Sequence, residues 1–383
     1  MNTSGTHDDH VVSTVIIGGG QAGLATAHAL LSRGQDCVVL ERNDRLGDNW
    51  RHHYDSLRLY TPARYDGLPG VPFPGEPWAY PTKDDVADYL QTYAAQLGLP
   101  VRLGVRVQRL ARGTAAGEDT EGGFVVETTA GTYHCDNVVV ATGTFGRRPH
   151  LPDFAADLDP AILQLHSSEY RRPSQLSPGP VLVVGASHSG CDIALELAET
   201  RPTTLVGRDC GQLPLRWDSP LLRAALPAVL FAWRHVLTRR TPIGRRTMPH
   251  VRQHGGPMLR VQRQDLAARG VVRNVSRVEG VRNGLPLLTD GTVVTATNIV
   301  WATGFEQHFD WIDLPVIDDE GWPREYRGVA DDVPGLFFCG LSFQYSFSSM
   351  VLPGVGRDAD YVAGRIVART RDRAEQATAL VRA

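Results

Sequence analysis

The sequence predicts an α/β protein built from two similar units, each with a three-layer plan around a parallel sheet. In both units an apolar, strand-like run leads into a glycine turn and then a helical pattern, first at Gly18 and again at Gly185. Both units close with a strand-turn-strand pattern that ends in the letters ATG, at Gly143 and at Gly304. The first and last glycines are 125 residues apart in one unit (143 − 18) and 119 in the other (304 − 185). This agreement indicates an internal repeat, with short antiparallel strands inserted before the last parallel strand of each unit.

Composition and charge are those of an ordinary globular protein. The 383 residues favour two domains, and a formal net charge of −3 gives no reason to expect nucleic acid as a partner. The five cysteines contain no CxxC pair, and the neighbouring His52 and His53 lack companions at metal-ligand spacing, so we expect neither a disulfide framework nor a metal site. No signal-peptide pattern and no long apolar run is present, which predicts a cytoplasmic protein.

The first glycine turn matches the pattern of a dinucleotide-binding unit. Gly18, Gly20 and Gly23 fit G-x-G-x-x-G, which provides a tight turn, close approach of the backbone to a pyrophosphate, and close packing of the helix on the strand. The following strand ends at Glu41, 23 residues after Gly18 (41 − 18), where a carboxylate can bind ribose hydroxyls. The same carboxylate would repel a 2′-phosphate. We therefore expect an adenine dinucleotide other than NADP in this turn.

The second turn, in PVLVVGASHSGCDIALELAE, lacks the middle glycine. Ser187 stands in its place, while Gly190 keeps the third position and Arg208 follows Gly185 by 23 residues (208 − 185). A guanidinium suits a 2′-phosphate, which favours NADP at this turn. Ser187 would hold the nucleotide farther off or donate its hydroxyl to a phosphate, as in an exchangeable site. A degenerate copy without a ligand stays open as the alternative.

Three further segments have more than one interpretation. Residues 45–74 are rich in aromatic side chains, arginine and proline, which suits either a wall around a flat ring system or a surface loop. Residues 216–273 hold many arginines and few acids, which fits a helix at a membrane interface, a cover over a substrate channel, or a helical insert packed on the second unit. The insert is favoured because Pro227 should break the helix early. Lys83 could orient a substrate acid but is rather expected in solvent, and His188 either touches a phosphate or faces solvent.

These motifs together resemble the two-dinucleotide-binding-domain flavoproteins, and among them the class B flavin-dependent monooxygenases. The likeness covers roughly residues 11–370 and rests on GGGQAG, GASHSG, the two ATG segments and HSSEY at His166 to Tyr170. It is closest to bacterial flavoproteins that are similar to plant indole-pyruvate monooxygenases. One departure is that Pro160 and Ile162 replace the Phe and Gly of the family pattern F-x-G-x-x-x-H-x-x-x-[Y/W]. A second is Thr61 and Pro62, where many nitrogen- and sulfur-oxidising members place an asparagine, so those substrates are disfavoured.

The resemblance implies two Rossmann-like domains, one for FAD and one for NADPH. The FAD-binding domain would comprise residues 1–152 and a return at 301–383, and the NADPH-binding domain residues 153–300, with the arginine-rich insert at about 216–260. The residues implied to hold FAD are Gly18, Gly20, Gly23, Glu41, Arg42, Gly47, Trp50, Arg51, Tyr60, Thr61, Val107, Ala141, Thr142, Gly143 and Gln344. Those implied for NADPH and the linkers are Gly185, Ser187, His188, Ser189, Gly190, Arg208, His166, Ala302, Thr303 and Gly304.

By the same resemblance the chain would be a monooxygenase that inserts one oxygen atom of O2 into a small organic substrate. NADPH would reduce FAD, and a peroxide at flavin C4a would transfer the oxygen, so the cofactor rather than a catalytic side chain carries the chemistry. Two alternatives stay open: a reductase that passes electrons to a quinone or a protein, and a flavoprotein accessory without turnover. The sequence leaves the substrate and the oligomeric state open.

Overall fold

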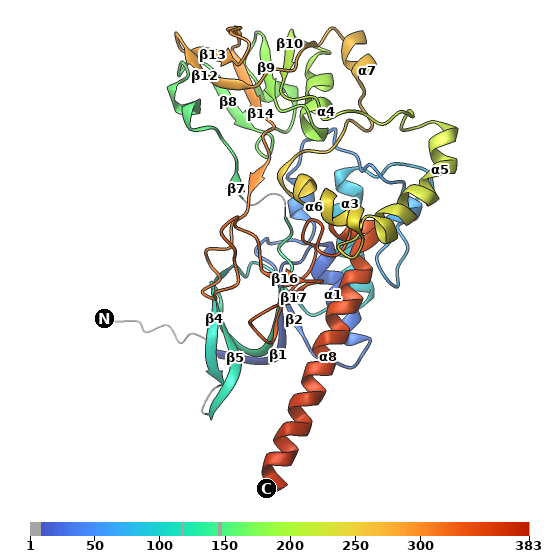
Figure 1. Ribbon diagram of the computed structural model, residues 1–383, viewed down its shortest axis with the longest axis vertical. Coiled ribbons are helices and arrows are strands. Elements are labelled where there is room, and N and C mark those ends of the chain that lie inside the picture. Colours follow the sequence, from blue (N-terminus) through green and yellow to red (C-terminus); the bar gives the residue numbers. More distant parts are fainter. Residues whose placement is uncertain (1–8, 116–117, 145–147, 383) are drawn as a thin grey trace.

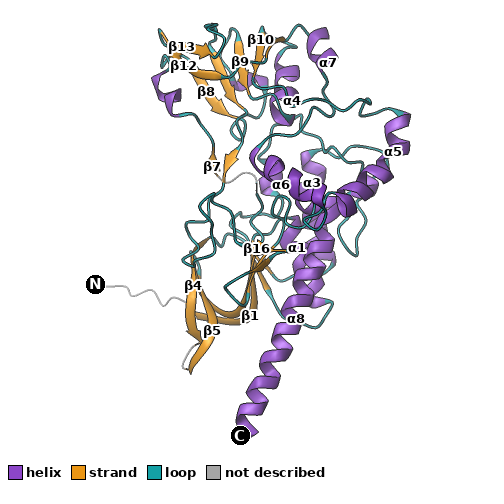
Figure 2. Ribbon diagram, viewed as in Figure 1, coloured by secondary structure: helices purple, strands orange, loops and turns teal. Residues whose placement is uncertain are grey.

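The computed structural model describes residues 9–115, 118–144 and 148–382 and contains two sheets with parallel strands at opposite ends of the molecule (Figures 1 and 2). Residues 1–8, where the sequence shows no signal-peptide pattern, lie outside this range. The predicted α/β class with a repeated parallel sheet is confirmed.

The first sheet has nine strands and draws on both ends of the sequence. Its main order is β16-β17-β18-β6-β1-β2-β3, and β5 joins β6 and carries β4 at its other edge. Strands β6, β1, β2, β3 and β18 run parallel, so the expected strand-like return near the chain end is part of this sheet. The strands are β1 (Asp9–Ile17), β2 (Val38–Leu40), β3 (Val101–Arg102), β4 (Val107–Ala115), β5 (Glu118–Thr128), β6 (Gly131–Val140), β16 (Glu325–Tyr326), β17 (Val329–Ala330) and β18 (Leu336–Phe338).

Helices cover one face of this sheet. Ile16 of β1 packs with the helices, whereas Val15 and Ile17 point into the core formed with β5 and residues 309–317, because side chains alternate along a strand. The closing helix expected from the sequence is α8, which packs along α1. The helical segments here are α1 (Gln21–Leu31), α2 (Asp48–Arg51), η1 (Ala63–Tyr65), α3 (Lys83–Gln96), η5 (Phe347–Met350) and α8 (Leu352–Arg382).

The second sheet is parallel throughout, in the order β11-β10-β9-β14-β8, and is formed by a continuous stretch of the chain. An antiparallel hairpin of β12 and β13 precedes β14, just as the antiparallel β4 and β5 precede β6, so the predicted insertions are present in both units. The elements of this unit are η2 (Asp153–Asp157), β8 (Leu163–His166), η3 (Pro173–Gln175), β9 (Val181–Val184), α4 (His188–Leu197), β10 (Thr203–Val206), α7 (Arg263–Ala268), β11 (Val272–Asn274), β12 (Val278–Arg282), β13 (Leu285–Leu288) and β14 (Asn298–Trp301).

The arginine-rich insert contains α5 (Pro220–Phe231), the π-helix η4 (Ala232–Val236) and α6 (Pro242–Gln253). The expectation that Pro227 breaks the first helix was wrong: α5 continues through it. Pro227 is exposed, so water can satisfy the carbonyl group whose helical partner is lost. Among the described residues no helix is long and apolar enough to cross a membrane.

The helical part of the insert packs on the first unit, whereas only its end, residues 254–258, lies on the second unit as favoured from the sequence. Arg239 donates to the carboxylate of Glu325 at 2.6 Å, and Arg252 lies 3.5 Å from the same carboxylate. Glu325 belongs to β16 and its side chain is fully buried. The backbone of Arg239 also donates to Tyr345, next to η5. Buried ion pairs between segments so far apart in sequence leave no periodic signal, so the sequence could not indicate this docking.

Candidate functional site

The two glycine turns have the same internal geometry. Gly18 and Gly185 have φ of +112° and +110°, and a Cβ on either would meet the carbonyl oxygen of Ala141 (2.7 Å) or Ala302 (2.2 Å). These alanines are the first residues of the two ATG segments. The third glycines are also equivalent, since a Cβ at Gly23 or Gly190 would lie within 2 Å of the carbonyl oxygen of the first glycine. The glycines and ATG segments are therefore repeated because the backbone contacts at these positions leave no room for a side chain.

The first turn is open at its middle position. A Cβ at Gly20 would meet no atom of the described residues within 4 Å apart from its chain neighbours. Helix α1 begins at the next residue, so its first N–H groups lie at this turn without helical acceptors. Glu41, directly after β2, accepts the N–H of Gly19 at 2.7 Å and the backbone and side-chain N–H groups of Asn43. Open space, helix N–H groups and a carboxylate are what the pyrophosphate and ribose of a dinucleotide require, so these residues fit FAD.

The residues expected on the flavin side form two sets with different surroundings. The Thr61 hydroxyl donates to Asp66 Oδ1 at 2.5 Å, and Asp66 is completely buried with no partner for Oδ2 among the described residues. Burial raises the pKa of Asp66 to about 8, while the Thr61 hydrogen bond opposes the rise. Tyr60 instead turns its hydroxyl toward the second unit, where it donates to Asp192 at 3.2 Å.

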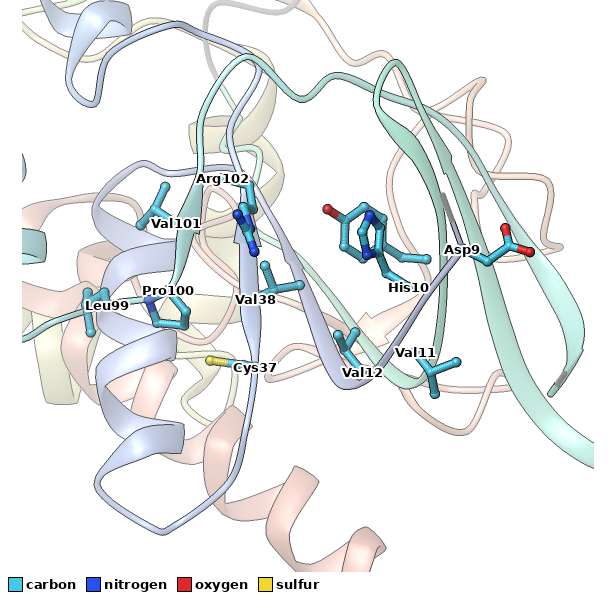
Figure 3. A pocket seen from close by; sticks show the side chains of 11 residues that line it. Asp9, His10, Val11, Val12, Cys37, Val38, Leu99, Pro100, Val101 and Arg102 are labelled. Carbon is cyan, nitrogen blue, oxygen red and sulfur yellow. The ribbon is translucent and has the colours of Figure 1, made fainter. Parts of the chain in front are cut away.

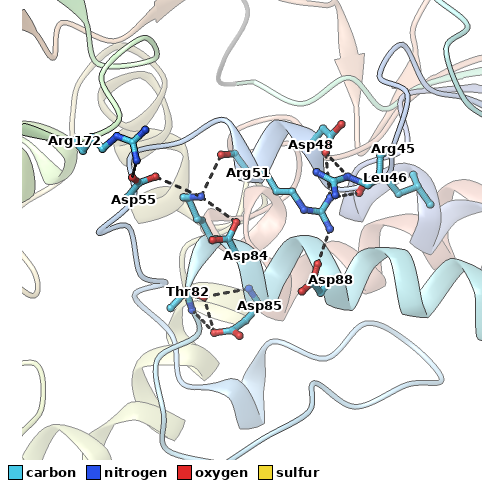
Figure 4. Close-up of polar contacts among 11 residues, drawn as sticks. Arg45, Leu46, Asp48, Arg51, Asp55, Thr82, Asp84, Asp85, Asp88 and Arg172 are labelled. Atoms are coloured by element: carbon cyan, nitrogen blue, oxygen red, sulfur yellow. Dashed lines mark hydrogen bonds and ion pairs between the residues drawn. The ribbon is translucent and has the colours of Figure 1, made fainter. Parts of the chain in front are cut away.

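Arg51 lies in a polar cluster between α2 and α3 (Figure 4). Its guanidinium donates to Leu46 and lies 3.2 Å from Asp48 and 2.6 Å from Asp88. Lys83 was expected in solvent, and this was wrong: it is 6% exposed and donates to the Arg51 carbonyl and to Asp84. Both cations therefore fasten α2 to α3.

Several other residues expected to hold the flavin make packing or backbone contacts within the first unit. Gly47 has φ of +81° and packs against Ala87 of α3, and Trp50 packs on the helical core. The Gln344 side chain is completely buried, and its amide oxygen accepts the Leu341 N–H. The remaining positions are Arg42, which is exposed after Glu41, Val107 at the start of β4, and Ala141, Thr142 and Gly143 after β6.

The second turn is covered at the position that is open in the first. Ser187 donates its hydroxyl to the Gly256 carbonyl at 3.0 Å, and a Cβ on Gly255 would lie 2.4 Å from the Ser187 Cβ. We call residues 254–258, which end the insert, the strap. Because the Ser187 hydroxyl is bound to the strap, it is not free in this arrangement to donate to a phosphate, which was one of the two roles expected from the sequence. Two adjacent glycines let the strap lie directly on the turn.

Asp192 on α4 joins the two units. Its Oδ2 accepts the hydroxyls of Tyr54 (3.1 Å) and Tyr60 (3.2 Å) and pairs with Arg260 at 2.9 Å. His188, one turn earlier, packs its ring 4.8 Å from that of Tyr60, and its Nε2 is buried without a partner among the described residues. Burial lowers the pKa of His188, so the ring is neutral. Ser189 and Gly190 follow it in the first turn of α4.

Arg208 lies at the carboxyl end of the second sheet, but not where Glu41 lies in the first. Strand pairing aligns Leu40 with Ile17 and Val206 with Val184, so the counterpart of Glu41 is Gly207 and that of Arg208 is Arg42. The sequence comparison matched Arg208 with Glu41 because each follows its first glycine by 23 residues. The connection through α4 is in fact one residue shorter than the connection through α1, so equal spacing does not give equivalent positions. Arg208 is exposed and has no ion pair within the described part of the chain. A guanidinium with no carboxylate before it suits a 2′-phosphate.

The two linkers between the units touch each other. Strand β7 (Arg148–Pro149) pairs antiparallel with β15 (Phe305–Glu306), directly after the two ATG segments. His166 is buried and donates from Nε2 to the Gly304 carbonyl at 3.0 Å, and Thr303 donates to the His150 carbonyl. Ala302 lies under Gly185. The surviving histidine of the HSSEY motif therefore fixes the second ATG segment.

Sequence reasoning missed Asp66, Asp192 and Arg260. Asp192 lies in the quoted fingerprint helix, two residues after Gly190, and its position on the inner face of an amphipathic helix was the available signal. Asp66 and Arg260 lie in irregular segments, where no periodicity reveals a buried charge.

One pocket of about 540 Å³ lies away from both turns (Figure 3). It is lined by residues at the starts of β1 and β2 and by Leu99 to Arg102, whereas nucleotides bind at the carboxyl ends of parallel strands. We assign it no role in the site. Within residues 9–115, 118–144 and 148–382 no group of three His, Cys, Asp or Glu side chains could hold a metal ion.

Comparison with known proteins gives consistent matches over most of the chain. Residues 15–214 match the family model of the pyridine nucleotide-disulphide oxidoreductases. An uncharacterized CzcO-like oxidoreductase of Geobacillus kaustophilus (strain HTA426) is 37% identical over 94% of this chain and 99% of its own. Indole-3-pyruvate monooxygenase YUCCA1 of Oryza sativa subsp. japonica is 31% identical over 95% of this chain and 93% of its own. The solved flavin-containing monooxygenase from Stenotrophomonas maltophilia has 26% identity and a TM-score of 0.73, covering 94% and 99%.

Proposed function

The chain belongs to the pyridine nucleotide-disulphide oxidoreductase family, and from this premise we propose that it is an NADPH-dependent FAD monooxygenase acting on a small organic substrate. The family resemblance and the oxidoreductase class predicted from the motifs are confirmed. The observation that carries the proposal is the pair of glycine turns with matched geometry. One is open and lies beside Glu41, and the other lies near the exposed Arg208.

We propose the following roles for the chain's own residues. Gly20 and the first N–H groups of α1 would hold the FAD pyrophosphate, and Glu41 its ribose. The start of α4 and Arg208 would bind NADPH. When bound, FAD would accept a hydride from NADPH and react with O2 at its C4a atom. The two sheets would then be the FAD-binding and NADPH-binding domains, with boundaries near residues 152 and 300.

The thiols argue against a disulfide reductase of the same family. Burial raises the pKa of Cys37, Cys135, Cys191 and Cys339 to about 12, so at neutral pH each stays protonated. The thiolate is the form that exchanges with disulfides, and a reductase of that type needs a pair of them. All five cysteines are free. Transfer of electrons to O2 needs no such pair.

Rapid mixing tests the proposal. The flavin-loaded protein is reduced with NADPH without oxygen and then mixed with O2 in the presence of NADP⁺. We expect a transient spectrum, distinct from both reduced and oxidised flavin, that persists for seconds or longer. Direct return of the oxidised spectrum would instead support a reductase, and no reduction by NADPH would support an accessory without turnover.

A further inference from the structure

The insert exposes an unusual number of large apolar side chains. Leu221, Phe231, Val236 and Ile243 are 69%, 60%, 41% and 54% exposed, and all lie between α5 and the start of α6. Single exposed apolar residues need no explanation, but several on one short segment indicate a surface that meets another apolar phase.

On α5 the exposed residues form one stripe. Leu221, Ala224, Ala228 and Phe231 are spaced three and four residues apart, so they share one face of the helix. The opposite face, with Leu222, Leu226 and Leu230, is buried against the protein. Helix α5 is thus apolar on both faces, and in Figure 1 it forms the right-hand edge of the molecule. None of the described residues covers the outer stripe.

The charged side chains between residues 219 and 264 have one sign. No Asp or Glu occurs between Asp218 and Asp265, although this stretch holds nine arginines. Four of them, including Arg239 and Arg252, are engaged with carboxylates elsewhere. The other five have no ion pair among the described residues and are all exposed: Arg223, Arg234, Arg240, Arg245 and Arg246. An apolar stripe with a cationic border matches the boundary between acyl chains and anionic headgroups.

We propose that the outer face of α5, η4 and α6 rests on an anionic phospholipid surface, with Leu221 and Phe231 inserted and the exposed arginines among the headgroups. A second copy of the chain fits this face less well. A symmetric dimer would place the same patch on both sides, and arginines would then meet arginines with no carboxylate of the segment between them. The proposal does not depend on the reaction that the protein catalyses.

Vesicle cosedimentation tests the proposal with the full-length, flavin-loaded protein. We expect binding to phosphatidylglycerol-containing vesicles, weak or no binding to pure phosphatidylcholine, and loss of binding at high salt. The double variant Leu221→Glu/Phe231→Glu should bind at least tenfold more weakly, as should Arg240→Gln/Arg245→Gln/Arg246→Gln. Unchanged flavin absorbance and melting temperature would show that the variants are folded.

The matched control is Val272→Glu/Val275→Glu, because both valines are 62% exposed but lie at the edge of the second sheet. It should bind vesicles like the wild type, and equal loss in this control would overturn the proposal. Failure of the wild-type protein to bind anionic vesicles would also overturn it. If, in addition, the protein sediments as a dimer that Leu221→Glu/Phe231→Glu converts to monomers, the face is instead an interface between copies.

Discussion

The turns at Gly18 and Gly185 share their first and third glycines but differ at the middle position and in their surroundings. The shared glycines touch backbone carbonyls of the chain itself, so any side chain there would clash. The middle position faces outward: Gly20 meets open space, whereas Ser187 meets the strap. The repeat thus preserves what packing requires, and the two units differ where each faces a ligand or a neighbouring segment.

The largest effect should come from Gly20→Val. A side chain there would occupy the approach of the FAD pyrophosphate, and we expect complete loss of flavin on purification. Because no atom of the described residues beyond its chain neighbours lies within 4 Å of the new Cβ, the variant should keep the wild-type circular dichroism spectrum. Ser187→Val, the matched change in the second unit, should retain flavin. A yellow Gly20→Val protein would contradict the assignment of the first turn.

Buried acids offer a second contrast between the units, because Asp192 has three partners and Asp66 only Thr61. The pKa of Asp66 is raised from 3.8 to about 8, so the folded state holds a proton that the unfolded state releases. The contribution of protonated Asp66 to the free energy of unfolding is present at low pH and is lost as the pH rises from about 4 to about 8. Relative to Asp66→Asn, the wild-type free energy of unfolding should fall by roughly 2–4 kcal/mol between about pH 5 and pH 8. Urea unfolding curves measure this, and parallel pH profiles would refute it.

Arg208→Ala tests whether the second unit binds the 2′-phosphate of NADPH. Loss of one charge-assisted contact of roughly 1.5–3 kcal/mol should raise KM for NADPH by roughly 10- to 100-fold and leave KM for NADH nearly unchanged. The control is Arg42→Ala, because Arg42 is the structural counterpart of Arg208 but follows Glu41. It should leave both KM values close to those of the wild type. Equal effects of Arg208→Ala on the two nucleotides would remove the basis for NADPH at the second turn.

The smallest effect is expected from Ser187→Gly, which makes the second turn resemble the first. The change removes the hydrogen bond to Gly256, of roughly 0.5–1.5 kcal/mol, and frees the strap from the turn. Steady-state kinetics should show KM for NADPH lowered by up to about fivefold. A higher KM would mean that the hydroxyl moves from Gly256 to a phosphate when the nucleotide binds.

Local sequence patterns predicted the parts of the fold that depend on local geometry. The glycine turns, the ATG segments and α8 follow from tight turns and helical periodicity, and the structure contains them all. Contacts between distant segments could not be predicted. Arg239 with Glu325, and Asp192 with Tyr54, join residues separated by 86 and 138 positions. Lys83 was misplaced because a lysine at a helix start carries no sign of a carbonyl acceptor 32 positions away, at Arg51.

The positions of the strands along the sequence determine the order in which the two sheets can form during synthesis. The second sheet is complete once β14 has been synthesised, because all its strands lie between residues 163 and 301. The first sheet must wait for β18, whose Phe338 pairs with Val140. During translation the second unit can therefore fold while β6 still has an unpaired edge, and such edges are sites of misassembly. Synthesis that stalls before residue 336 would release a chain with one finished unit and one open sheet.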